Sequence, residues 1–281
     1  MSNLSSPAAL FGRLRQPKKA PGVSALGAFF CACLSLALPA AADCVLGPAD
    51  EIVALKDVQD GDTLLLEDGR RVRLIGVNAP ELGRDGRAAQ PLAQEAQEFA
   101  QLFLEDGDLE LVYDRDRRDR YGRVLAHVYN HRGESLEAAL LAAGLAFHVA
   151  IAPNLGLAEC LAERQAEARR AGRGVWAPGT WPVLRASEVR PGDGGFVLLR
   201  GQVLEVDQNR FVWLELDGPV AVRLRRDREN GQLVRRDWQD REIEVKGWLV
   251  DRGAKYASRF PQNKRWYIAV DSEFTIEISR K

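Results

Sequence analysis

Hydrophobic and polar residues alternate in short runs after residue 50, and turn signals separate these runs. Between Glu51 and Val77, leucine-rich and β-branched runs are divided by two Asp-Gly turns, which predicts a meander of three strands. Two further runs, Leu109–Val112 and Val124–Tyr129, predict two more strands joined by the charged loop 114–121. The first part of the chain therefore has a mainly β character.

Helical spacing interrupts and follows these strands. Apolar residues recur at intervals of three and four from Leu92 to Leu104, and Gly107 ends the pattern, which predicts an amphipathic helix. A leucine and alanine run from Ser135 to Gly144 predicts a second helix. A third is expected over 157–171, before Gly172. Five strands with three helices thus precede Trp176.

The composition changes after residue 177. Proline and glycine cluster over 178–195, which predicts an interdomain linker between a domain at 43–177 and a β-rich domain at 196–281. The second domain has about the number of strands that a small five-stranded, OB-like barrel needs. Its expected strands are Phe196–Val206, Arg210–Leu216, Val220–Leu224, Glu242–Leu249 and Trp266–Asp271.

Residues 1–42 have the order of an export signal: four basic residues and no acid, an apolar run over 23–38, then small residues. The apolar run is shorter than the roughly 20 residues of a membrane-spanning helix. We predict cleavage before Asp43 and a periplasmic or secreted protein with no stable membrane anchor. An uncleaved anchor is the alternative. A lipoprotein is disfavoured, because Asp43 and not a small residue precedes Cys44.

Loss of the signal makes the protein acidic. The formal net charge of the whole chain is −1, and removal of four cations takes it to about −5. A partner with many phosphates must therefore meet a local basic cluster or a bound cation, because the overall charge does not attract it.

Two of the four cysteines leave with the signal, so Cys44 and Cys160 remain. In an oxidising compartment they form a candidate disulfide, although two unpaired thiols are the alternative. With three histidines and no CxxC, a zinc site has no support. Residues His127, His131 and His148 are interpreted as surface or packing residues, not catalytic ones.

Arg73, Glu81 and Arg123 form a candidate catalytic set. Attack on a phosphodiester builds negative charge on the phosphorus oxygens and needs a positioned water. The planar guanidinium of arginine donates two parallel hydrogen bonds to phosphate oxygens. Glu81, on an Ala-Pro turn after a strand, is a candidate general base. Each residue alone is also typical of a turn or a strand edge, so the prediction depends on the combination, in which the segment Pro153-Asn154 also stands out.

A cation is expected beside these residues. Asp62, Asn78 and the backbone carbonyl of Ala79 form an all-oxygen set of hard ligands. Calcium fits such a set best, and magnesium is the alternative.

Four motifs match one known family in order and spacing. They are Asp60-Gly61-Asp62-Thr63, an arginine five residues before Asn78 and eight before Glu81, Asp119-Arg120-Tyr121-Gly122-Arg123, and Gly172-Arg173-Gly174-Val175-Trp176. This pattern resembles the staphylococcal nuclease (thermonuclease) family over residues 52–176. The resemblance implies a five-stranded OB-type barrel with three helices and calcium-assisted hydrolysis of DNA and RNA that leaves 3′-phosphates. It also implies that Arg73, Glu81 and Arg123 are catalytic and that Asp62 is a calcium ligand.

The chain departs from that family at two places. Asn78 stands where the best-known members carry a second metal-binding aspartate, and the loss of one ligand charge should weaken calcium binding. Val149 and Ile151 stand where well-studied members carry tyrosines that contact the nucleotide, and aliphatic groups cannot stack in the same way. Arg120 and Tyr121 are the remaining basic and aromatic candidates for substrate binding.

The second domain interleaves aromatic and basic residues, a composition found on surfaces that bind single-stranded nucleic acid and also in ordinary barrels. The sequence predicts DNA or RNA as the substrate and implies no protein partner. A catalytically silent nucleic-acid- or protein-binding module is the alternative to an endonuclease. The residues concerned are Trp213, Trp238, Trp248, Tyr256, Phe260, Trp266 and Tyr267 with Arg223, Arg225, Arg226, Arg252, Lys255, Arg259, Lys264 and Arg265.

Overall fold

The computed structural model describes residues 44–281 except 84–85, 87, 106, 209–210, 226–236, 255–263 and 279–281. The predicted export signal and part of the basic and aromatic set (Arg226, Lys255, Tyr256, Arg259 and Phe260) lie outside the described residues. In the part of the chain that the structure describes, no helix combines the length and the apolar character needed to cross a membrane.

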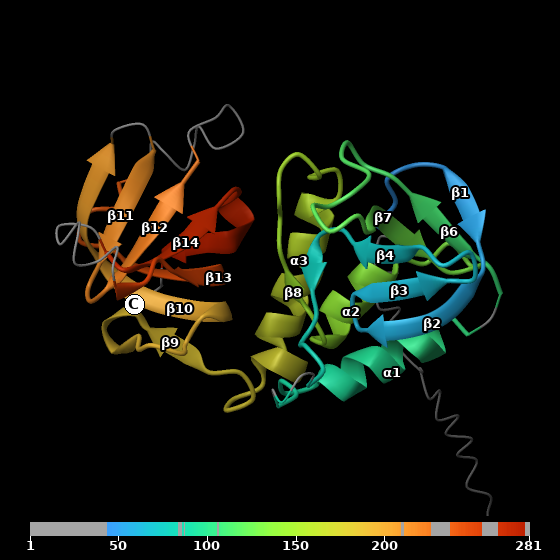
Figure 1. The fold of residues 1–281 in the computed structure, drawn as a ribbon, viewed down its shortest axis with the longest axis horizontal. Coiled ribbons are helices and arrows are strands. Elements are labelled where there is room, and N and C mark those ends of the chain that lie inside the picture. Colours follow the sequence, from blue (N-terminus) through green and yellow to red (C-terminus); the bar gives the residue numbers. More distant parts are fainter. Residues whose placement is uncertain are drawn as a thin grey trace, which may run out of the picture. The chain divides into compact units, whose positions relative to one another are not determined.

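The first domain is built on a closed barrel (Figure 1). Its sheet has the order β1-β6-β7-β4-β3-β2, and β1 continues into β2 across Ala54, so that the two ends of the sheet belong to one bent strand. Strands β4 and β7 are parallel and the other neighbours are antiparallel. The five predicted strands are confirmed. Their bounds are β1 Glu51–Val53, β2 Leu55–Asp60, β3 Thr63–Leu66, β4 Arg71–Leu74, β6 Leu109–Val112 and β7 Val124–Tyr129.

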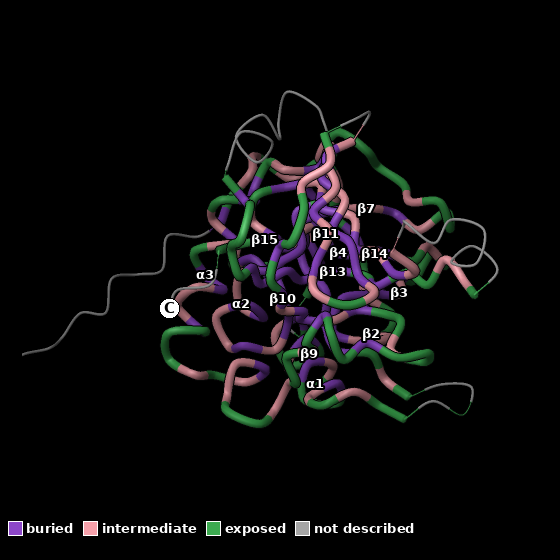
Figure 2. The backbone as a smooth tube through the Cα atoms, turned by 90° about the vertical axis from the view of Figure 1, so that its left-hand side faces the viewer, coloured by how far each residue is buried: buried purple, intermediate pink, exposed green. Residues whose placement is uncertain are grey.

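Residues of alternating burial fill this barrel. Leu64 and Leu66 of β3, Val72 and Leu74 of β4 and Leu111 of β6 are buried in one apolar cluster. Successive side chains of a strand point to opposite faces, so these residues line the interior while their neighbours face outward. The buried stretches coincide with strands such as β3, β4 and β13 in Figure 2.

Three α-helices complete the first domain: α1 Ala93–Phe103, α2 Leu136–Ala143 and α3 Ala158–Arg170. Helix α1 packs on β2, and α2 packs on both α3 and β7. Ser135 caps α2, because its hydroxyl accepts a hydrogen bond from the amide of Ala138 at 3.2 Å. Gly144 ends that helix with a positive φ of 72°, which glycine adopts without strain. The predicted helix positions are therefore confirmed.

A second, two-stranded sheet joins β5 (Val77–Asn78) to β8 (Phe147–His148). Val77 pairs with His148, and Asn78 pairs with Phe147. Strand β8 is too short to give a periodic signal, and the sequence did not predict it. It holds the end of β5 beside the segment that follows α2.

The second β-rich region also forms a closed circuit of strand pairings, β10-β11-β12-β14-β13-β10. Its third and fifth strands, β12 and β14, are parallel, as β4 and β7 are in the first barrel. All five predicted strands are present. Their bounds are β10 Gly195–Gln208, β11 Val212–Leu216, β12 Val220–Leu224, β13 Glu242–Asp251 and β14 Trp266–Val270.

Two edge strands of this region were not predicted. Strand β9 (Val183–Arg185) pairs with β10 inside the segment 178–195 that the sequence assigned to a linker, and β15 (Ile276–Ile278) pairs with β13. Three residues carry too little pattern to identify a strand. The remaining elements are short 3₁₀ helices at Gly174–Trp176, Ala186–Glu188 and Glu273–Thr275.

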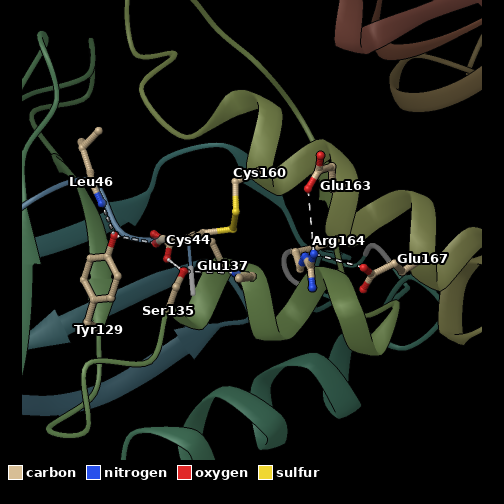
Figure 3. The surroundings of a disulfide bond; sticks show 10 residues. Cys44, Leu46, Tyr129, Ser135, Glu137, Cys160, Glu163, Arg164 and Glu167 are labelled. Carbon is tan, nitrogen blue, oxygen red and sulfur yellow. Dashed lines mark hydrogen bonds and ion pairs between the residues drawn. A yellow bond between two sulfur atoms is a disulfide. The ribbon is translucent and has the colours of Figure 1, made fainter. Parts of the chain in front are cut away.

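The predicted disulfide between Cys44 and Cys160 is present, with Cα atoms 5.8 Å apart (Figure 3). It joins the start of the described chain to α3. The Tyr129 hydroxyl supports it, because it donates to the carbonyl of Cys44 at 2.9 Å and accepts from the amide of Leu46 at 3.2 Å. Burial, with the nearby charge of Glu137, raises the pKa of Tyr129 to about 12, so this hydroxyl remains a donor at any physiological pH.

Replacement of both cysteines by serine should lower the free energy of unfolding by about 2–5 kcal/mol, because the bond closes a long loop. Urea unfolding of the double variant, compared with the oxidised protein, measures the loss. The reduced wild-type protein is the matched control and should unfold at the same urea concentration as the variant. Equal stability of the oxidised and variant proteins would contradict the expectation.

Candidate active site

One cavity of about 700 Å³ collects most of the predicted site residues. The candidate catalytic residues Arg73, Glu81 and Arg123 all line it. Asp62, Asn78, Arg120 and Tyr121 line it as well. Ala79 is not among the lining residues, but its amide donates a hydrogen bond to Asp62. The cavity lies at one end of the first barrel, where β3, β4 and β5 meet the loop before β7. The fold therefore brings together residues that are up to 61 positions apart in the sequence.

Arg73 is the most fully bonded of these residues. From β4, its Nη1 donates to the carbonyls of Leu74 and Val77, each at 2.8 Å. Its Nη2 donates to Asn78 Oδ1 at 3.2 Å and lies 3.0 Å from Asp62 Oδ2. These contacts hold the guanidinium in one orientation and fix the turn between β4 and β5 around it.

Asp62 is a buried carboxylate, 4% exposed, at the turn between β2 and β3. Its Oδ2 accepts from the amide of Ala79 at 2.7 Å and pairs with Arg73, while its Oδ1 accepts from the Thr63 hydroxyl at 3.1 Å. Burial raises the pKa of Asp62 to about 7, against the opposing effect of Arg73. A nearby positive charge would therefore favour its ionised form.

Gly61 explains why the chain turns so tightly here. A Cβ atom at this position would lie 2.7 Å from the Ala79 Cβ and 2.8 Å from the Ala96 Cβ of α1. Only glycine lets the turn approach both neighbours so closely. The turn thereby presents Asp62 to Ala79 and Arg73.

Arg123 is positioned by Asp119 in the loop before β7. Its Nε donates to Asp119 Oδ2 at 2.7 Å, and its backbone amide donates to Asp119 Oδ1 at 2.9 Å. Partial burial opposes ionisation of Asp119, but the hydrogen bonds from Arg123 and Tyr121 outweigh it and lower the pKa of that carboxyl. Arg123 also lies over the Tyr121 ring, 5.7 Å from its centre.

Thr63 joins the two candidate catalytic arginines. It pairs with Arg73 across β3 and β4, and its hydroxyl accepts from Arg123 Nη1 at 3.5 Å. In the parallel pair of β4 and β7, Arg73 lies opposite Leu125, two residues after Arg123. Because side chains two apart share a face, both arginines belong to the same face of the sheet.

Glu81 lies at the exposed edge of the cavity, after β5. Two hydrogen bonds with Gln90 fix its backbone: the Glu81 amide donates to Gln90 Oε1 at 2.7 Å, and its carbonyl accepts from the Gln90 amide at 2.9 Å. Its negative charge contributes to the raised pKa of Asp62. The carboxylate is therefore within electrostatic reach of the buried pair and open to water.

The predicted cation ligands are oxygen atoms, which is the ligand type that a hard divalent ion prefers. Oxygens of Asp62 and Asn78 converge on one Arg73 nitrogen, at 3.0 and 3.2 Å, so a side chain from the β2–β3 turn and one from β5 point to the same region. Ala79 makes its contact through its amide, whereas the sequence prediction used its carbonyl. Among the described residues no three His, Cys, Asp or Glu side chains form a metal-binding group.

The sequence assigned no role to several residues that position the site, although it singled out Asn154 within the segment Pro153-Asn154. Asn154 holds the charged loop, because its Oδ1 accepts from the Asp116 amide and its Nδ2 donates to the Asp116 carbonyl, both at 2.8 Å. Asp119, Thr63 and Trp248 also line the cavity. Asp119 and Thr63 belong to the quoted motifs, which could have identified them. Trp248 belongs to the second β-rich region, where the sequence placed it in the aromatic and basic set without linking it to this cavity.

Two guanidinium groups can donate to the oxygens of a phosphoryl group, and a water-accessible carboxylate can accept a proton from water. The family model described as staphylococcal nuclease homologue matches residues 71–178. Thermonuclease from Staphylococcus hyicus is 33% identical over 123 residues, which are 43% of this chain and 72% of that protein. Thermonuclease from Staphylococcus intermedius is 35% identical over 129 residues, 45% of this chain and 76% of that protein. Endonuclease YncB of Bacillus subtilis is 38% identical over 98 residues, 34% of this chain and 46% of that protein. The chain belongs to the staphylococcal nuclease family.

His148 lies behind the site and is fully buried in β8, against the ring of Phe274 at 5.6 Å. Burial, with the nearby charge of Lys246, lowers the pKa of His148 to about 3. Between pH 6.5 and 3 the unfolded chain therefore binds a proton that the folded protein does not, so stability falls as the pH is lowered through this window.

His148→Gln should reduce that acid-induced loss of stability. Urea-unfolding free energies at pH 7 and pH 4.5 give the difference for each protein, and the variant should lose less than the wild type. His131→Gln, at an exposed turn, is the control and should leave the difference unchanged. Equal pH dependence in the wild type and His148→Gln would show that this imidazole is not responsible.

Proposed function

We propose that this protein is an exported endonuclease that hydrolyses phosphodiester bonds in DNA or RNA with the help of a divalent cation. Membership of the staphylococcal nuclease family supports a nuclease activity, as do relatives named thermonuclease and endonuclease. Calcium is the first choice of cation because the candidate ligands are oxygens, and magnesium is the alternative. The relatives' names do not distinguish DNA from RNA.

The observation that carries the proposal is the placement of Arg73 and Arg123 on one face, joined through Thr63, in the same cavity as Glu81. Two guanidinium groups, one from β4 and one from the loop before β7, can bind different oxygens of one phosphate. Protein contacts already fix both groups, so little reorganisation is needed when charge develops on the phosphate.

In this mechanism Glu81 accepts a proton from the attacking water. Its exposed position lets water reach it, and its fixed backbone keeps the carboxylate at the cavity edge. Arg73 and Arg123 stabilise the additional negative charge of the transition state. Asp62 and Asn78 would hold the cation, which supplies further positive charge at the phosphate when bound. The single carboxylate of this pair favours modest cation affinity.

Four arginines give the cavity its contacts for a polyanion: Arg73, Arg118, Arg120 and Arg123. Five carboxylates line the same cavity, so phosphate binding depends on where the guanidinium groups lie and on a bound cation, not on an excess of positive charge. Export fits the disulfide, since such bonds persist in oxidising compartments.

Glu81→Gln should lower the cleavage rate by about 10²–10⁴-fold, the usual contribution of a general base, without a change in fold. Arg123→Lys should also lower it strongly, because lysine cannot reproduce the planar fork that also bonds Asp119. Rates on DNA and RNA are measured with calcium, magnesium or chelator. Glu95→Gln on the exposed face of α1 is the control and should keep full activity.

Chelator should abolish cleavage, and added calcium should restore it. Activity that neither chelator nor the two substitutions reduce would overturn this mechanism. Binding of nucleic acid without any cleavage would favour a catalytically silent module.

Export is tested separately from catalysis. The protein recovered from the periplasm or the culture fluid should begin at Asp43 when its N-terminus is sequenced. Ala42→Phe should block processing, because the signal peptidase requires small residues before the cleavage site. Recovery of the intact chain in the membrane fraction for both forms would instead support an uncleaved anchor.

A further inference from the structure

Trp248 of the second barrel lines the cavity that holds the candidate catalytic residues. It is 42% exposed, unusually open for an indole ring in an ordered strand. Val149 and Ile151, from the segment that follows β8, also line this cavity. The cavity is therefore not a feature of the first barrel alone.

Ring contacts fix Trp248 in this place. It lies opposite Phe196 in the pairing of β13 with β10, and the two rings meet edge to face with centres 5.3 Å apart. Phe196 in turn contacts Phe147 at 5.1 Å, and Phe147 pairs with Asn78 of the site. Aromatic contacts thus connect Trp248 to the strand that carries a candidate cation ligand.

An ion pair also fixes β13, the strand that carries Trp248. Arg169 of α3 donates to Glu244 of β13 at 2.6 Å, and the Glu244 carboxylate is buried. Arg200 of β10 bonds the second oxygen of Glu244 at 2.7 Å. A buried carboxylate with two arginine partners holds a strand in register, so β13 has a defined place beside the first barrel.

The cavity otherwise offers little for a nucleobase to stack on. Among its described lining residues only Tyr121 and Trp248 are aromatic. The Tyr121 ring already contacts the guanidinium groups of Arg120 at 4.8 Å and Arg123 at 5.7 Å. Valine and isoleucine have no π-face, so Trp248 and the more exposed Tyr121 are the rings that a base can meet, and Tyr121 is the one that already contacts two guanidinium groups.

We propose that Trp248 is a substrate-positioning residue that stacks on a nucleobase next to the scissile phosphate. This inference rests on the proposed nuclease function and specifies its substrate class. A base must leave its helical stack to reach the indole, so the site favours unpaired strands over duplexes. The second barrel then contributes one wall of the nuclease site.

The test compares two substrates of equal length, an oligodeoxythymidine and an oligomer with the same sugar-phosphate backbone but no bases. Trp248→Ala should lower kcat/KM for oligodeoxythymidine by about tenfold, mainly through KM, equivalent to about 1.4 kcal/mol. Cleavage of the abasic oligomer should change less than twofold. Trp248→Phe should retain most of the wild-type value, because phenylalanine keeps a stacking face.

Trp213→Ala is the matched control. Trp213 packs against Tyr267 and Arg252 on the same barrel and does not line the cavity. It should leave both substrates unaffected, and thermal melting of each variant confirms that it folds. Equal losses on both substrates in Trp248→Ala, or no loss on either, would overturn the stacking role.

A binding measurement keeps the inference separate from the proposed activity. Oligodeoxythymidine should quench tryptophan fluorescence of the wild type, and most of this change should be absent in Trp248→Phe. If the wild-type protein cleaves neither substrate, the nuclease proposal fails, while quenching still shows whether Trp248 meets a base. Quenching of equal size in the wild type and Trp248→Phe would refute the contact.

Discussion

The contact between Arg73 and Asp62 is the interaction on which the site depends. Arg73 satisfies four acceptors at once, and these lie on β4, on β5 and at the turn before β3. Asp62 is bonded in addition by the Ala79 amide. A buried ion pair with this many hydrogen bonds is costly to disrupt, because removal of either partner leaves the charge of the other uncompensated. The same contacts that stabilise the end of the barrel therefore also orient the cavity residues, so a substitution at either partner affects the fold and the cavity together.

The sequence was sufficient for the first barrel and for the core of the site because both are specified locally. Arg73, Asn78 and Glu81 lie within nine residues, so a strand followed by a short turn already determines their relative positions. The Asp119–Arg123 motif works in the same way, because Asp119 bonds both the backbone and the side chain of Arg123. Helix ends were predictable where a cap residue such as Ser135 or Gly144 marks them.

The rest depends on contacts between distant segments. Strand β8 has two residues and exists because β5 lies beside it, so no periodicity can identify it. The sequence places Trp248 in a set typical of surfaces that bind single-stranded nucleic acid and also of ordinary barrels, and only the packing of β13 brings it to the cavity. The sequence shows no repeat, yet it predicted an OB-type barrel for the first region and an OB-like barrel for the second, and both circuits include a parallel pair of the third and fifth strands. The two circuits therefore share a backbone topology although their side chains differ.

The disulfide has a consequence for how the protein tolerates proteolysis. Every predicted catalytic and cation-binding residue lies between Cys44 and Cys160, inside one covalent ring. A protease that cuts a single exposed loop of this ring, such as the charged segment before β7, leaves both fragments joined. The barrel strands on either side of the cut can then stay paired, so a nicked molecule keeps its two arginines and Glu81 in one body. Tolerance of a single cut is a separate property from resistance to unfolding.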